Sequence, residues 1–103
     1  MNNEIKPDLK QQTFYNSINN YINTDDIIFS DAPQIANFYI RNKVYTLDRI
    51  DDFNNYSHNR YIIISREAFP NEIWRGEKKI KGLNIVRGYS IKNYYLYQIV
   101  KNK

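Results

Sequence analysis

Residues 60–65, Arg60-Tyr61-Ile62-Ile63-Ile64-Ser65, form the most apolar run of the chain. The run is short, rich in β-branched side chains and bounded by polar residues, which is typical of a buried strand. It lacks the apolar and polar alternation of a half-exposed strand, so both of its faces are expected to be covered. We therefore predict that residues 60–65 form the central strand of a sheet, with all three isoleucines buried.

Helix and strand patterns alternate on the N-terminal side of this run. The predicted elements there are a helix at 9–22, a strand at 27–30, a helix at 32–40, a strand at 43–47 and a helix at 49–55. The first helix begins after Asp8, its expected N-cap. Its apolar side chains share one face at helical spacing: Leu9, Phe14, Tyr15, Ile18, Tyr21 and Ile22.

Two short helices are expected to begin at an aspartate. Asp31 precedes Ala-Pro-Gln in a capping-box pattern, so it should cap the helix at 32–40. That helix is expected to bury its apolar side chains, which are Ile35, Phe38 and Tyr39. Asp48 should cap the helix at 49–55, with Ile50 and Phe53 pointing inward.

The C-terminal part predicts a turn of helix at 71–74 and two strands at 83–89 and 94–100, joined by a four-residue hairpin turn. Strands that alternate with helices over short connections indicate a parallel sheet. The chain is therefore predicted to be one α/β domain over 1–103, a small three-layer Rossmann-like fold with a C-terminal antiparallel hairpin. The expected order of the parallel strands is 2-1-3, with the hairpin on one side.

Composition excludes several classes of function. With 103 residues the chain is long enough for one modest core. It has no cysteine, which excludes thiolate metal sites and cysteine nucleophiles. One histidine excludes a metal site with two histidines, and three glycines are too few for a glycine-rich phosphate loop. No cofactor and no metal is expected. No apolar run approaches the roughly 18 residues of a membrane span.

The charge is mildly basic and unevenly distributed. The net charge is +4, and residues 75–103 carry eight lysines and arginines against Glu77 alone. Such a bias is suited to phosphates or anionic headgroups, although it is also common on an ordinary solvated surface.

A candidate polar site lies where the parallel strands end, because open parallel sheets bind ligands at their carboxyl edge. The residues there are Ser30, Asp31, Ser65, Arg66 and Glu67. If the first and third strands are neighbours, Asp31 and Arg66 meet above the sheet. They would form either a small binding pocket or a pair of helix caps with one salt bridge, and both interpretations need the same residue types.

Other polar residues suggest further sites. His58 lies in a polar loop, where Asp51 or Asp52 would be the partner that a catalytic histidine needs. Adjacent carboxylates at 25–26 and 51–52 suit either a metal or the starts of helices, as caps and dipole partners, and the second interpretation is the commoner one.

The C-terminal hairpin is rich in tyrosine and basic residues: Arg87, Tyr89, Lys92, Tyr94, Tyr95, Tyr97 and Lys101. Such a ribbon would bind single-stranded nucleic acid by stacking, or it would pack its rings across the two strands. The first reading makes the chain a stand-alone nucleic-acid-binding or protein-interaction module.

Four segments together resemble a known family: residues 26–33, 38–47, 60–67 and 94–100. They are similar to the soluble C-terminal domain of polytopic membrane glycosyltransferases of the dolichyl-phosphate-mannose protein mannosyltransferase and aminoarabinose transferase type. The resemblance spans about residues 10–100.

The resemblance implies a non-catalytic accessory domain that contacts either the acceptor or the membrane-embedded part of a larger chain. It carries no catalytic residue onto this sequence, because in such enzymes those residues lie in the membrane half. The domain would then lie on the extracytoplasmic face of the membrane. If Met1 is instead the native start, a cytoplasmic location is expected.

Overall fold

A computed structural model of the chain describes residues 9–65, 79–80, 83–91 and 94–100. The predicted turn of helix at 71–74 lies outside these residues. In chain order the elements are α1 (Leu9–Tyr21), β1 (Ile27–Ser30), α2 (Pro33–Tyr39), β2 (Val44–Thr46), the 3-10 helix η1 (Leu47–Phe53), β3 (Arg60–Ser65), β4 (Lys79–Ile80), β5 (Leu83–Ile91) and β6 (Tyr94–Ile99).

The strands form one sheet in the order β2-β1-β3-β6-β5-β4. β1 pairs in parallel with β2 and with β3, so that Ile28 lies opposite Val44 on one side and Tyr61 on the other. β6 pairs antiparallel with both β3 and β5. The predicted order 2-1-3 of the first three strands and the C-terminal hairpin are both confirmed.

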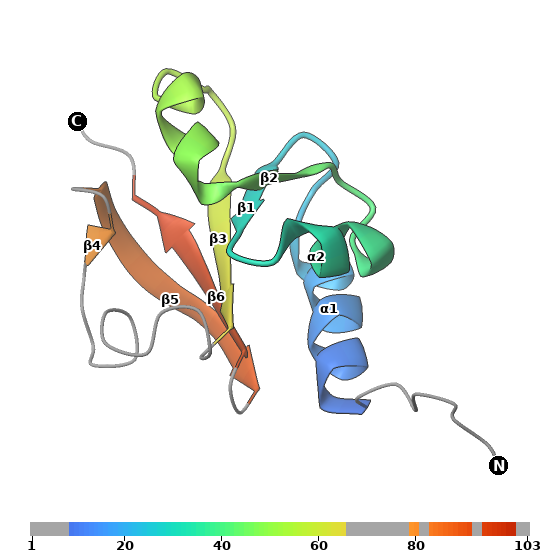
Figure 1. Ribbon diagram of the computed structural model, residues 1–103. Coiled ribbons are helices and arrows are strands. Elements are labelled where there is room, and N and C mark those ends of the chain that lie inside the picture. The colour runs from blue at the N-terminus through green and yellow to red at the C-terminus, as the bar shows by residue number, and fades with distance from the viewer. Residues whose placement is uncertain (1–8, 66–78, 81–82, 92–93, 101–103) are drawn as a thin grey trace, which may run out of the picture.

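The prediction of a Rossmann-like domain is wrong, because the antiparallel pairing is not confined to an edge hairpin but makes up half of the sheet, although helices do cover both of its faces. Among the described strands, β1, β2 and β3 pair in parallel, and the other half of the sheet is antiparallel. Figure 1 shows this antiparallel half, β4 to β6, at the opposite end of the sheet from β2. The chain thus makes two crossover connections and then turns back on itself, so it does not build the repeated parallel units of a Rossmann-like fold.

The core lies on both faces of the sheet. On one face α1 packs Phe14, Tyr15 and Ile18 against Ile63 of β3 and Leu96 of β6. On the other face η1 packs against Phe29, Ile62, Ile64, Tyr97 and Ile99. Ile62, Ile63 and Ile64 are all fully buried, as predicted, since successive side chains of β3 point to opposite faces and both are covered.

Helix α1 confirms the helix predicted at 9–22, but two members of its predicted apolar face, Leu9 and Tyr21, are exposed. For the second helix, the predicted burial of Ile35 and Phe38 is wrong. Ile35 is 43% exposed and Phe38 is 81% exposed, and Ala36 is the buried residue of α2. With seven residues, α2 is two turns long and brings one narrow row of side chains to the sheet.

The aspartate caps predicted for the two short helices are also wrong, and Asp8, the cap predicted for the first helix, lies outside the described residues. The N-cap of α2 is Ala32, which makes no side-chain capping bond. Asp31 remains in line with the strand, because its N–H donates to the carbonyl of Ile63 at 3.4 Å. The Ser30 hydroxyl instead accepts the N–H of Ala32 at 3.0 Å.

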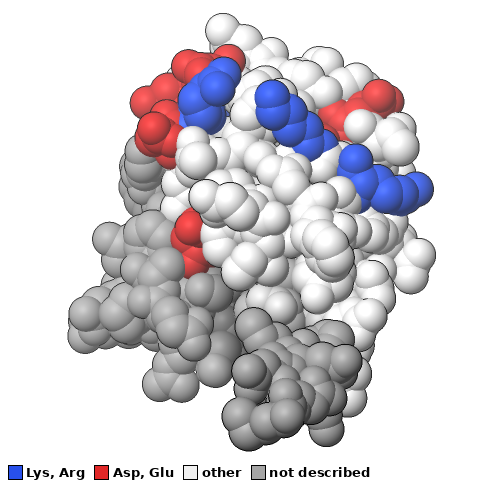
Figure 2. Space-filling view, turned by 45° about the vertical axis from the view of Figure 1, so that its right-hand side comes forward, with Lys and Arg blue, Asp and Glu red and all other residues white. Residues whose placement is uncertain are grey.

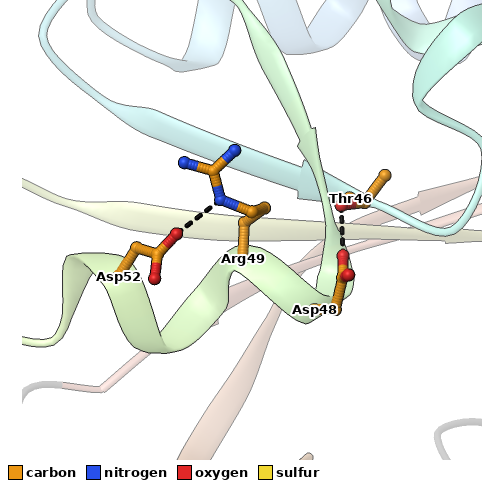
Figure 3. A network of polar contacts seen from close by, with 4 residues as sticks. All are labelled: Thr46, Asp48, Arg49 and Asp52. Carbon is orange, nitrogen blue, oxygen red and sulfur yellow. Dashed lines mark hydrogen bonds and ion pairs between the residues drawn. The ribbon is translucent and has the colours of Figure 1, made fainter.

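The third predicted helix is the 3-10 helix η1, not an α-helix at 49–55, and its N-cap is Thr46. Asp48 lies in the first turn, where its carboxylate accepts the Thr46 hydroxyl (Figure 3). Asp52 pairs with Arg49 on the surface of η1 (Figure 3).

Candidate functional site

The carboxyl edge of the parallel strands holds the site residues that the sequence predicts. Ser30 is buried there and its hydroxyl also donates to the Asp31 carboxylate at 3.3 Å. Ser65 ends the neighbouring strand, β3. Arg66 and Glu67 lie outside the described residues, so the contact between Asp31 and Arg66 stays a prediction.

A polar pocket lies at the opposite, amino edge of the same strands. Three connections meet there: the α1–β1 loop, the α2–β2 loop and the η1–β3 loop, toward the top of Figure 1. Together they enclose a hollow of about 640 Å³ that opens to solvent. Its walls are formed by Ile22, Asn23, Thr24, Asp25, Asp26, Arg41, Ser57, His58 and Asn59. We call this hollow the amino-edge pocket.

Asp26 and Asn42 hold the first two loops together beneath the pocket. The buried Asp26 carboxylate accepts the N–H of Asn23 at 2.8 Å, which closes the turn after α1. The Asn42 side-chain amide donates to the carbonyl oxygens of Asn23 and Asp26, each at 2.9 Å. Both side chains hold the loop backbone in place, so the wall formed by residues 22–26 is fixed before any ligand arrives.

The third loop is fastened in the same way. The Tyr56 hydroxyl donates to the carbonyl of Asp25. The N–H of Ile27, at the start of β1, donates to the carbonyl of Asn59 at 3.0 Å, and the Asn59 side chain accepts Gln98 at 3.3 Å. The pocket is therefore largely pre-formed, as binding sites for small ligands usually are.

The rim of the pocket carries polar groups of both signs. Asp25, Thr24 and His58 are exposed there. Arg41 is also exposed but is held in place, because its N–H donates to the Asn19 side chain at 3.0 Å and its guanidinium donates to the Asn19 carbonyl at 2.7 Å. Donors and acceptors thus face a common space from three loops.

The electrostatic environment of the pocket disfavours an anion. Helix α1 ends beside it, and the C-terminal end of a helix carries a partial negative charge. Asp25 and Asp26 add two carboxylates to the same wall. The effect reaches the neighbouring Tyr61, where burial and then the Asp26 charge raise the pKa of the hydroxyl above its ordinary value.

The side chains near His58 differ in part from those that the sequence suggested. Asp52, one of the two carboxylates expected beside it, is paired with Arg49. His58 instead lies with its ring centroid 5.5 Å from that of Tyr56, and it shares the pocket with Asp25. Within the described residues, no three His, Asp or Glu side chains gather closely enough to hold a metal ion.

The hairpin tyrosines pack mainly into the domain. The rings of Tyr89 and Tyr94 lie 5.8 and 5.5 Å from that of Phe14, and Tyr97 is buried on the other face. The Tyr89 hydroxyl also donates to Ser17 at 3.2 Å. Lys92 and Lys101 lie outside the described residues. The contacts favour cross-strand and core packing over a free stacking platform for these three rings.

Sequence reasoning missed the amino-edge pocket, including Arg41 and Asn59 in its walls and Asn42, which ties two of its loops together. One signal was available, since Asp26, Asn42 and Asn59 lie one or two residues before the three strands begin. Parallel strands bring such positions to one edge, but that inference needs the strand order first.

Comparison of the chain with known protein families, with curated proteins and with solved structures finds no match. None of the helices in the described residues is long and apolar enough to cross a membrane.

Proposed function

We propose that this chain is a non-catalytic accessory domain that holds a neutral, hydroxylated ligand, such as one sugar unit of an acceptor, in the amino-edge pocket. The observation that carries the proposal is the pocket itself, a pre-formed hollow of about 640 Å³ lined from three loops by amide, hydroxyl, carboxylate and guanidinium groups. The part that concerns a parent membrane glycosyltransferase rests on the resemblance of the four sequence segments.

The chemistry of the walls supports a neutral ligand. A sugar ring presents several hydroxyls that both donate and accept hydrogen bonds, which suits a wall holding Asn23, Asp25 and Asn59 beside Arg41. A phosphate would meet two aspartates and the C-terminal end of α1, which repel it. Because Asp26 is buried and accepts the Asn23 N–H of its own turn, the exposed Asp25 is the carboxylate better placed to accept ligand hydroxyls.

Amide chemical-shift titration of the whole chain tests this proposal. The probes are a neutral hexose, a neutral N-acetylhexosamine and inorganic phosphate, each raised to about 50 mM, well above a weak dissociation constant of about 1 mM. The sugars should shift the amides of residues 23–26 and 57–59, and phosphate should not. Asp25→Asn should weaken sugar binding about tenfold, because a charged acceptor is lost. Asp51→Asn, an exposed carboxylate on η1, is the matched control.

Two results would count against the proposal. Shifts produced by phosphate but by neither sugar would make the pocket an anion site, and no shift with any probe would remove the ligand-binding role. The glycosyltransferase part has its own test in the genomic reading frame. Several apolar spans encoded in frame upstream of Met1 would support it, whereas a stop codon directly before Met1 would contradict it.

The alternative, a nucleic-acid-binding or protein-interaction module on the C-terminal hairpin, has less support. It needs exposed rings, whereas Tyr89 and Tyr94 pack on Phe14.

A further inference from the structure

The backbone around Arg41, between α2 and β2, is fixed on both sides by asparagine side chains. Asn37 accepts the N–H of Val44 at 2.8 Å and donates to the carbonyl of the same residue at 3.1 Å. Asn19 of α1 donates to the carbonyl of Tyr39 at 2.8 Å and accepts the N–H of Arg41 at 3.0 Å. These four bonds give the segment that carries Arg41 into the amino-edge pocket one defined position.

The guanidinium of Arg41 is held at the C-terminal end of α1. It donates to the Asn19 carbonyl at 2.7 Å, in the last turn of the helix. The N–H of Asn23, four residues further on, instead donates to the Asp26 carboxylate, so Arg41 satisfies a carbonyl at the helix end. A guanidinium has five N–H donors and this bond uses one, so Arg41 can donate to a ligand as well.

The other charges of the pocket oppose that of Arg41. Asp25 and Asp26 line the same hollow, and Arg41 is the one lysine or arginine among its described lining residues. Figure 2 shows basic and acidic side chains close together at the upper end of the molecule, where Figure 1 places the three loops. Without the guanidinium, two carboxylates and the C-terminal end of α1 would make the pocket strongly attractive to a cation.

We propose that Arg41 sets the charge selectivity of the amino-edge pocket, by favouring a neutral hydroxyl over an ammonium group, and that Asn19 is its positioning residue. A ligand hydroxyl can accept from Arg41 while it donates to Asp25, so it uses both groups. An ammonium group has no acceptor for Arg41, and its charge is repelled by the guanidinium. The inference rests on the ligand-binding role proposed above and adds the residue that selects the ligand by charge.

Titration of the full chain with two matched ligands tests the inference. One is a neutral hexose, and the other is its analogue with an amine in place of the primary hydroxyl, which is protonated at neutral pH as a lysine amine is. The shifts of the amides of residues 23–26 and 57–59 give a dissociation constant for each. Arg41→Met should change the ratio of the two constants about tenfold in favour of the amine, the effect of one charge near a wet surface.

Two further variants separate charge selectivity from general damage to the pocket. Lys43→Met removes an exposed cation that lies over the Tyr45 ring and outside the pocket, so the ratio should stay at its wild-type value. Asn19→Ala removes both side-chain bonds beside Arg41 and should change the ratio about threefold in the same direction as Arg41→Met. A loss of packing alone would weaken both ligands together and leave the ratio unchanged.

The outcomes distinguish this inference from the proposed function. Hexose binding by the wild type, with an unchanged ratio in an Arg41→Met variant that keeps the wild-type circular dichroism spectrum, would overturn the role of Arg41 and leave the pocket as a ligand site. Equal weakening of both ligands by Asn19→Ala would overturn the positioning role of Asn19. If neither ligand shifts the wild-type amides, the proposed function and this inference both fail.

Discussion

Replacing Arg60 with methionine is expected to stabilise the fold. Arg60 begins β3 and is 6% exposed, on the same face of the sheet as Ile62. One terminal nitrogen of its guanidinium, Nη1, is buried and has no hydrogen-bond partner among the residues that the structure describes. Loss of hydration lowers the pKa of Arg60 below its ordinary value, yet the group stays charged at neutral pH.

The size of the gain follows from these contacts. A buried donor without a partner costs about 1–3 kcal/mol relative to its hydrated state. Methionine keeps most of the length of the arginine stem, so much of the apolar surface that Arg60 buries beside its strand partner Ile27 stays buried. We expect Arg60→Met to raise the free energy of unfolding by about 1–2 kcal/mol. For a domain of this size that raises the melting temperature by about 4–16 °C.

Urea and thermal denaturation, followed by circular dichroism, measure this change. Arg60→Lys is the matched control, because it keeps a buried charge and should bring no gain. A midpoint for Arg60→Met at or below that of the wild type would refute the reasoning, since it would mean that the guanidinium contributes a favourable interaction to the folded state.

Two further predictions concern the core. Ile63→Ala should lower the free energy of unfolding by about 2–5 kcal/mol, because Ile63 is fully buried and its loss leaves a cavity, whereas Ile35→Ala on the exposed side of α2 should change it by less than about 0.5 kcal/mol. Equal urea midpoints for the two variants would contradict the placement of β3 at the centre. Burial, and secondarily the Asp31 charge, raises the pKa of the Tyr15 hydroxyl above its ordinary value. As pH rises, this hydroxyl therefore ionises in the unfolded chain before it does so in the folded one. The free energy of unfolding should then fall as pH rises above about 10. Tyr15→Phe should reduce this alkaline loss of stability, measured as the fall in melting temperature with pH. An unchanged dependence on pH would contradict the role of Tyr15.

Local sequence patterns predicted the elements better than the details of their ends. The helix at 9–22 and the strands around β1, β2 and β3 follow from the spacing of apolar residues, which reports the period of each element directly. Asp31 shows where local reasoning failed. Its neighbours match a capping box, but the hydrogen bond from Asp31 to Ile63 keeps it in the strand, and Ile63 is 32 residues away in sequence.

The site was harder to predict than the fold. The sequence pointed to the carboxyl edge, because general experience with parallel sheets places ligands there. The amino-edge pocket depends on contacts between distant loops, such as Asn42 with Asn23 and Tyr56 with Asp25. No local pattern marks these residues, since asparagine and aspartate are common in every loop.

By itself the sequence determined that residues 60–64 are buried on both faces, that helices and strands alternate before them, and that a hairpin follows, because apolar periodicity and turn residues act over a few positions. The tertiary structure alone decided that the hairpin joins the sheet at β3, through β6, and that Phe38 stays in solvent while Ala36 meets the sheet. It alone also decided that three loops close around one pocket. These features depend on which segments meet across the fold, and the free energy of such contacts is set by partners that the local sequence does not contain.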